Sequence, residues 1–316
     1  MKVLLILLLT LSSLLAQSMT LPSKKFEAAA RVTDLVYNKN KLYASTTAGE
    51  IDIFDIQTQK IVQKIKIAKI KDFMGDTIDA KIYSVDLLDD SVLLLSQAKS
   101  SYNKVSLYKK SQLTTIIGLE SKLPIAKAKF LNENTIILAL LSNDIISYDI
   151  KTKKRNWTTQ ASMSKFSNFA LNEDKSKIVV ADESGDLHIL DTKNGKNIQI
   201  LSAENLDNVF AVDYKNNTIA TAGKDRRTVI YNLNFHSAYY KTSSFLIYAV
   251  GLSPSAKLAA YSSDEKNNIT VFKTSTKSVV AVFGGIKMTP TKILFLNENE
   301  FLVASDDKVI NLYKIK

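Results

Sequence analysis

Residues 42–60, LYASTTAGEIDIFDIQTQK, decide the fold of this chain. They read as an apolar run, a polar turn, an alternating run that ends in an aromatic side chain, and a second turn. Variants of this stretch recur as far as the last residue. Together they make seven copies, at residues 42–60, 91–111, 135–154, 177–196, 218–234, 257–277 and 301–316. The sequence is therefore a tandem array of one short unit.

The period of the array can be measured on the large apolar residue that closes the alternating run. Successive differences are 54, 40, 42, 41, 41 and 41 residues, taken over Phe54, Tyr108, Tyr148, Leu190, Tyr231, Phe272 and Tyr313. A repeat of about 40–45 residues with four short strands is typical of propeller blades. The runs are too short for helices and are bounded by Asn, Asp, Ser and Gly. The sequence therefore predicts an all-β, seven-bladed β-propeller.

The pattern within each unit predicts how its strands are covered. Second strands such as 135–140 are almost wholly apolar, which indicates that neighbouring blades cover both faces. Third strands such as 50–54 alternate, so we expect one of their faces to meet solvent. The last copy stops at Lys316 after its third strand, which would leave an open sheet edge. We therefore expect residues 24–30 to supply the outer strand of the C-terminal blade.

The first residues predict export. Residues 1–16 combine Lys2, an apolar run at 3–15 and a small Ala16, which predicts a signal peptide cleaved after Ala16. An uncleaved anchor is the alternative, but the run is shorter than the roughly 20 apolar residues that span a bilayer. Residues 17–316 are expected to form a single domain. The absence of cysteine fits a bacterial periplasm better than a disulfide-rich secreted domain, and it excludes a lipid anchor on cysteine.

Composition argues against nucleic-acid binding. The net charge is +11, but only four of the 42 basic residues are arginine, and the lysines are scattered beside acidic residues. Nucleic-acid recognition favours arginine and clusters the charge. We expect solvated lysine-rich surfaces and no nucleic-acid partner.

The sequence contains few candidate residues for catalysis, cofactor binding or metal binding. The only histidines, His188 and His236, are expected near opposite faces, so they predict no shared metal site. No nucleophile-elbow GxSxG, GxGxxG or Walker-type motif occurs, and the chain has only nine glycines. We therefore expect no catalytic, cofactor-binding or metal-binding residues, and a protein that is not an enzyme.

Two stretches are candidate partner-binding elements. The first repeat interval is longer by about a dozen residues, and the excess falls in 66–81, where Phe73 and Met74 are expected at an exposed loop tip. A harmless surface insertion is the alternative.

The second stretch is a basic turn with Lys224, Arg226 and Arg227, since arginine is enriched in interface hot spots. The aromatic residues Phe235, Tyr239 and Tyr240 lie on the next hairpin, which we expect on the opposite face from the basic turn. Alternatively, the two tyrosines belong to an ordinary outer strand.

The repeats resemble the WD-repeat family. Residues 184–191 (SGDLHILD), 48–55 (AGEIDIFD) and 223–232 (GKDRRTVIYN) stand where that family has its S-x-D-G-x-I-x-x-W-D motif, but the Trp and the Gly-His pair are missing. This resemblance implies a WD40-like scaffold that binds proteins. As a whole, the exported, cysteine-free chain also resembles NapL, the accessory proteins of periplasmic nitrate reductase gene clusters. That resemblance implies a periplasmic accessory or maturation factor whose partner is a reductase subunit, without a cofactor of its own.

Two alternatives stay open at this point. One is a propeller enzyme or a small-ligand binder that uses the central channel. The other is a soluble relative of outer-membrane assembly propellers.

Overall fold

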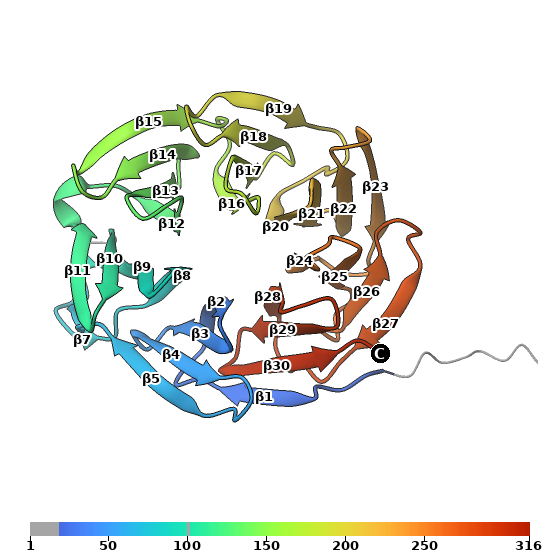
Figure 1. Ribbon diagram of the computed structural model, residues 1–316, viewed down its shortest axis with the longest axis horizontal. Helices are drawn as coiled ribbons and strands as arrows, with labels where there is room; N and C mark the ends of the chain where they lie inside the picture. Colours follow the sequence, from blue (N-terminus) through green and yellow to red (C-terminus); the bar gives the residue numbers. More distant parts are fainter. Residues whose placement is uncertain (1–18, 100–101) are drawn as a thin grey trace, which may run out of the picture.

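The computed structural model describes residues 19–99 and 102–316, so the predicted signal peptide lies outside the described residues. Seven four-stranded antiparallel sheets stand around a central axis (Figure 1). The number of blades and their all-β character confirm the predicted seven-bladed propeller. Within the described ranges, no helix is long and apolar enough to cross a membrane.

Each of the first six blades uses four consecutive strands. Blade 1 contains β2 (Val32–Asn38), β3 (Lys41–Thr46), β4 (Glu50–Asp55) and β5 (Ile61–Lys66). Blade 2 contains β8 (Ile82–Leu88), β9 (Ser91–Gln97), β10 (Asn103–Lys109) and β11 (Gln112–Ile117). Blade 3 contains β12 (Ile125–Phe130), β13 (Thr135–Leu140), β14 (Asp144–Asp149) and β15 (Lys154–Gln160).

The remaining blades follow the same order up to the C-terminus. Blade 4 contains β16 (Phe166–Leu171), β17 (Lys177–Asp182), β18 (Leu187–Asp191) and β19 (Asn197–Leu201). Blade 5 contains β20 (Val209–Lys215), β21 (Thr218–Gly223), β22 (Arg227–Asn232) and β23 (Ser237–Thr242). Blade 6 contains β24 (Val250–Leu252), β25 (Leu258–Ser262), β26 (Ile269–Lys273) and β27 (Val279–Phe283).

Blade 7 closes the ring with both ends of the chain. It contains β28 (Pro290–Phe295), β29 (Glu300–Ser305), β30 (Val309–Lys314) and, as its outer strand, β1 (Lys24–Glu27). In the antiparallel register, Phe26 lies opposite Ile310. Figure 1 shows β1 alongside β30. The predicted closure is therefore confirmed, and β1 covers the sheet edge that the last repeat leaves open.

The burial of the third strands differs from the sequence expectation. β4 and β18 are buried on both faces, including the polar side chains Asp52 and His188. The expectation of one solvent-facing side was wrong, because adjacent blades pack face to face and cover their inner three strands. The outer strands carry the exposure instead, as in β5 and β19.

A buried polar network in blade 5 fixes the link that enters this blade. Thr221 donates its hydroxyl proton to Asn205 Oδ1 at 2.7 Å, and Asn205 Nδ2 donates to the Tyr231 hydroxyl at 3.0 Å. The amide of Leu206 donates to Asp225 Oδ2 at 2.8 Å. These bonds satisfy buried polar groups and hold the link against the blade.

The two faces of the propeller are built from different connections. In an up-and-down sheet, the first-to-second and third-to-fourth turns lie on one face, which we call the turn face. The second-to-third turns and the links between blades lie on the other, which we call the link face.

Candidate functional site

The inner strands of the seven blades surround a cavity on the propeller axis. Its volume is about 370 Å³, and all seven inner strands contribute to its lining. Glu173 and Lys175, from a first-to-second turn, also line it, so it reaches the turn face. Eight charged side chains line the cavity: Lys127, Lys129, Lys175, Lys215, Lys292, Asp86, Glu173 and Asp213.

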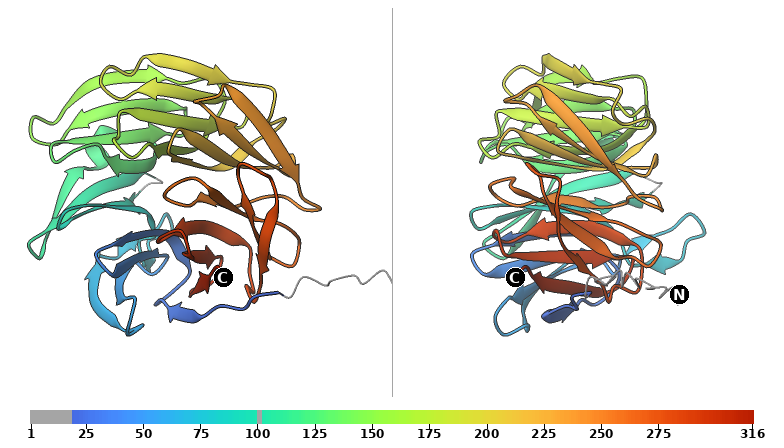
Figure 2. Two further views of the ribbon diagram at one scale, coloured as in Figure 1. Left: turned by 45° about the vertical axis from the view of Figure 1, so that its right-hand side comes forward. Right: turned by 90° about the vertical axis from the view of Figure 1, so that its right-hand side faces the viewer.

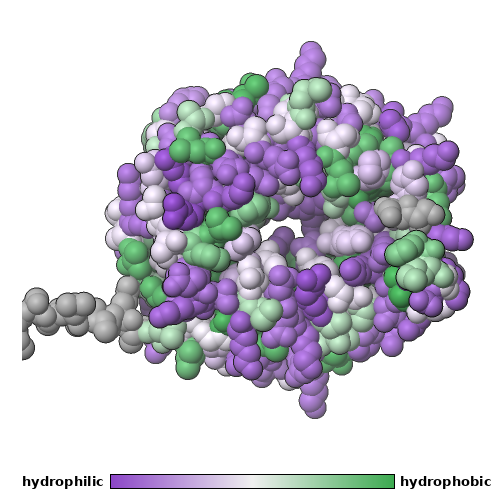
Figure 3. Space-filling view, turned by 180° about the vertical axis from the view of Figure 1, so that it is seen from behind, coloured by the Kyte–Doolittle hydropathy of each residue, from purple (hydrophilic) through white to green (hydrophobic). Residues whose placement is uncertain are grey.

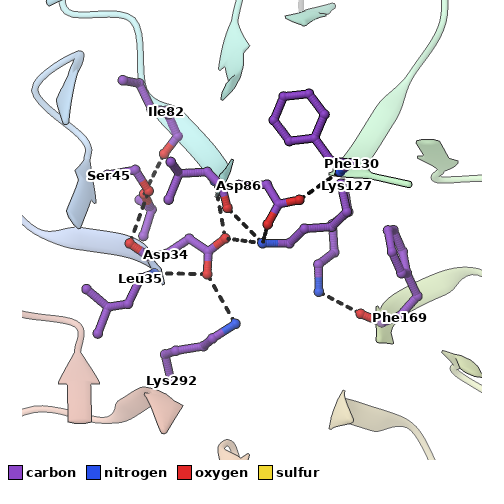
Figure 4. Close-up of polar contacts among 12 residues, drawn as sticks. Asp34, Leu35, Ser45, Ile82, Asp86, Lys127, Phe130, Phe169 and Lys292 are labelled. Carbon is purple, nitrogen blue, oxygen red and sulfur yellow. Dashed lines mark hydrogen bonds and ion pairs between the residues drawn. The ribbon is translucent and has the colours of Figure 1, made fainter. Parts of the chain in front are cut away.

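Asp34 of β2 holds the centre of the charged cluster (Figure 4). Its carboxylate is buried, with Oδ2 3.5 Å from Lys129 Nζ and Oδ1 3.2 Å from Lys292 Nζ. The amide of Val85 donates to Oδ2 at 3.2 Å. Burial alone raises the pKa of Asp34, but the lysine charges outweigh it and hold this pKa well below 3.8. The ionised carboxylate therefore ties blades 1, 2, 3 and 7 together.

Lys129 of β12 is fully partnered. Its Nζ donates to the Val85 carbonyl at 2.7 Å and lies 3.5 Å from carboxylate oxygens of both Asp34 and Asp86. Burial opposes the charge, but these two carboxylates raise the pKa of Lys129 above 10.5. An ammonium has three N–H donors, and each of them has an acceptor here. Lys129 is therefore part of the framework.

Lys127, two residues earlier on the same strand, lies in a different environment. Its Nζ donates to Asn168 Oδ1 at 2.6 Å and to the Phe169 carbonyl at 2.7 Å, and it lies 5.0 Å from the centre of the Phe169 ring. No carboxylate within the described ranges forms an ion pair with it. Burial, followed by the charges of Lys292 and Lys129, holds the pKa of Lys127 well below 10.5.

The carboxylates that line the cavity bind backbone amides of the following blade. Asp86 Oδ2 accepts from the amide of Phe130 at 2.7 Å, and Asp213 Oδ2 accepts from that of Leu252 at 2.8 Å. Glu173 Oε1 accepts from the amide of Asn216 at 2.6 Å. These acids join successive blades, and Asp86 pairs with Lys129 through its other oxygen.

The predicted tip residues Phe73 and Met74 lie on a small hairpin of the link face. The hairpin pairs β6 (Ile70–Lys71) with β7 (Thr77–Ile78) and projects beyond the disc (Figure 2). Phe73 is 97% exposed and Met74 is 75% exposed. Asp72 Oδ1 accepts from the amide of Met74 at 2.9 Å, which fixes the turn. Within the segment that we expected to be a long loop, the structure holds a short hairpin with both residues at its tip.

The predicted basic turn, Lys224 to Arg227, lies between β21 and β22 and therefore also on the link face. Lys224 and Arg226 are exposed, and Lys224 Nζ lies 3.3 Å from Asp207 Oδ2. Arg227 is half-buried and donates to the Glu204 carbonyl at 2.8 Å.

The guanidinium of Arg227 lies 4.0 Å from the centre of the Tyr240 ring, which corrects the expectation that the aromatic patch is separate from the basic turn. The antiparallel pairing of β22 with β23 brings the two side chains together at one sheet end. Tyr239 is a packed strand residue, and burial raises its pKa to about 12. Phe235, by contrast, lies in the β22–β23 turn, on the turn face.

Exposed apolar side chains concentrate on the link face. Each of the six links that join blades 1 to 7 carries at least one, and one second-to-third turn adds another: Phe73, Met74, Leu119, Leu141, Met163, Leu206, Phe245 and Met288. Figure 3 shows this face, with separate apolar patches around the central opening. Within residues 19–99 and 102–316, the turns of the opposite face carry only Phe235 among exposed large apolar residues.

Metal ligands do not converge within the part of the chain that the structure describes. No group of three His, Cys, Asp or Glu residues there could hold a metal ion. His188 is buried in β18, where Nδ1 contacts the side-chain amide of Asn197 at 3.2 Å. His236 lies in the β22–β23 turn.

Comparison with known proteins supports the fold alone. No family model and no curated protein matches the chain. The solved β-propeller domain of Cps50 (Swd1) from Myceliophteria thermophila matches with a TM-score of 0.73, covering 93% of this chain and 99% of that domain. The sequence identity is 14%, so this similarity concerns the fold alone. The chain has a WD40-like, seven-bladed β-propeller fold.

The lysines of the channel were missed in the sequence. The inner strand IAKAKF, residues 125–130, places two lysines on one face of a strand that should line the axis. That alternation was a usable signal. Their approach to Asp34 and Lys292 could not be predicted, because these residues belong to blades far apart in sequence.

Proposed function

We propose that the protein is a non-catalytic, protein-binding propeller whose link face is the docking face. The observation that carries this proposal is the β6–β7 hairpin, whose Phe73 and Met74 project almost fully exposed from a face that bears further apolar side chains. Exposed aromatic and Met side chains are enriched at interfaces, and a small central cluster of them usually supplies most of the binding energy. Lys224 and Arg226 add exposed charge to the same face.

The finer proposal is a periplasmic accessory or maturation factor for periplasmic nitrate reductase. The leader-like residues 1–16 and the cysteine-free composition support export to a periplasm. The resemblance to NapL supports the reductase subunit as partner. N-terminal sequencing of the periplasmic fraction tests the location, and we expect the mature chain to start at Gln17.

The docking face is tested by a matched pair of variants. Phe73→Ser with Met74→Ser removes the hairpin tip, and Phe235→Ser removes an exposed aromatic residue from the turn face. The readout is the Kd for the purified reductase catalytic subunit, measured by surface plasmon resonance. We expect the double variant to weaken binding by about tenfold or more, which is the loss of a hot spot, and the Phe235 control to leave it unchanged.

Two results would contradict these proposals in different ways. Equal loss in both variants would contradict the assignment of the link face. Recovery of outer-membrane assembly components instead of the reductase in a periplasmic pull-down would contradict the partner and favour the assembly-propeller alternative.

A further inference from the structure

The cavity on the propeller axis carries spare hydrogen-bond donors. Lys127 Nζ has two acceptors, Asn168 Oδ1 and the Phe169 carbonyl, and an ammonium has a third N–H. Lys292 Nζ has one acceptor among the described residues, Asp34 Oδ1 at 3.2 Å, which leaves two N–H groups.

A buried hydroxyl belongs to the same strand as Lys292, β28. Thr291 lines the same cavity, and its Oγ1 is buried without a hydrogen-bond partner within the described ranges. A buried hydroxyl without a partner is costly, and native structures leave few of them. A bound group in the cavity that accepts hydrogen bonds would satisfy the spare N–H groups of Lys127 and Lys292.

The charge around these donors is also unbalanced. Five lysines and three acids line the cavity, and Asp34 behind them leaves an excess of one positive charge when all are ionised. Asp86, Asp213 and Glu173 already accept from backbone amides of the next blade. Burial is the largest cause of the low pKa of Lys127, and the nearby charges of Lys292 and Lys129 lower this pKa further.

We infer that the channel is a binding site for a small anion, a compact molecule with a carboxylate or phosphate group, held by Lys127 and Lys292. A cavity of about 370 Å³ is within the usual size of small-ligand sites. Asp34 holds the Lys292 amine in place, and Asn168 with the Phe169 carbonyl holds that of Lys127 (Figure 4). The opening toward the turn face gives the ligand an entry on the side away from the docking face.

The test is isothermal titration calorimetry on the mature protein with two probes, inorganic phosphate and acetate. We expect saturable binding of at least one of them, and the stronger probe distinguishes a phosphate ligand from a carboxylate ligand. Lys127→Met and Lys292→Met should each weaken binding by about tenfold or more, as expected for the loss of a hydrogen bond to a charged group. Lys193→Met, on an exposed turn of blade 4, is the control and should bind as the parent does.

The possible contrary results are distinct. No binding of either probe by the parent protein, in millimolar titrations at matched ionic strength, would overturn the inference. Binding that persists in both variants, or falls equally in the Lys193→Met control, would place the anion elsewhere and also overturn it. If Lys127→Met fails to fold, Lys292→Met decides the question. Because the hairpin variants leave Lys127 and Lys292 unchanged and are read out by protein binding, failure here leaves the docking proposal standing.

Discussion

The closure of the ring by β1 can be tested with Phe26→Ala. Phe26 is fully buried, and its ring packs edge-on against that of Phe54 with centroids 5.6 Å apart. Truncating a buried Phe to Ala costs about 3–5 kcal/mol, because apolar contact is lost and a cavity remains. The site is a seam between the two ends of the chain, so neighbouring side chains have little freedom to refill it.

The expected change in melting temperature follows from the size of the fold. Unfolding entropy of about 2.1 cal/mol/K per residue over roughly 300 folded residues gives about 0.6 kcal/mol/K. A loss of about 3–5 kcal/mol then lowers Tm by about 5–8 °C. Differential scanning calorimetry measures this shift. Lys25→Ala is the matched control, since Lys25 lies on the same strand with its side chain exposed and should change stability by less than about 0.5 kcal/mol.

The melting temperatures also show whether β1 stabilises blade 7. If Phe26→Ala melts at the same temperature as Lys25→Ala, β1 does not hold blade 7 in solution. Deletion of residues 23–30 extends the test, because it removes the pairing with β30 as well as the buried ring. We expect a larger loss than for Phe26→Ala, and an unchanged melt would refute the closure.

Three further predictions concern charged side chains. The pKa of Asp34 is held below its ordinary value of 3.8, so the ionised carboxylate stabilises the parent above that pH, and this contribution is lost as the pH falls below it. Asp34→Asn should therefore lose less stability than the parent on acidification, and a parallel decline in both proteins would contradict the assignment. Lys129→Met should lower the free energy of unfolding, measured by chemical denaturation, by about 3–5 kcal/mol, because it leaves buried carboxylates unpaired. Lys127→Met should change it by no more than about 1 kcal/mol. Equal losses in the two variants would contradict their different roles. Arg227→Lys should lower Tm, because lysine cannot both stack on Tyr240 and keep the hydrogen bond to the Glu204 carbonyl. The weaker packing on Tyr240 should change the near-UV circular dichroism spectrum. An unchanged spectrum and Tm would contradict the contact.

The blade architecture was predictable because its determinants are local. The repeat spacing, the turn residues and the strand periodicity all lie within about 40 residues of one another. The missing fourth strand of the last repeat even predicted the closure by residues near Phe26. The burial of Asp52 and His188 was not predictable from alternation, since the cover comes from a neighbouring blade.

The candidate sites also differ in whether local sequence or tertiary contacts determine them. Exposure of Phe73 and Met74 followed from an insertion in the repeat spacing, which is a property of the sequence. The position of Arg227 over Tyr240 depended on strand pairing across a hairpin, and the sequence interpretation separated them.

By itself, the sequence determined the number of blades, the order of their strands and the place where the ring closes, because each of these follows from a short repeated pattern. Only the tertiary structure decided which charges meet on the axis. Asp34, Lys127 and Lys292 are separated by more than two blades of sequence, and ring closure alone brings blades 1, 3 and 7 around one cavity. Lys127 is buried in this cavity without a carboxylate partner among the described residues, and no pattern in the sequence predicts this.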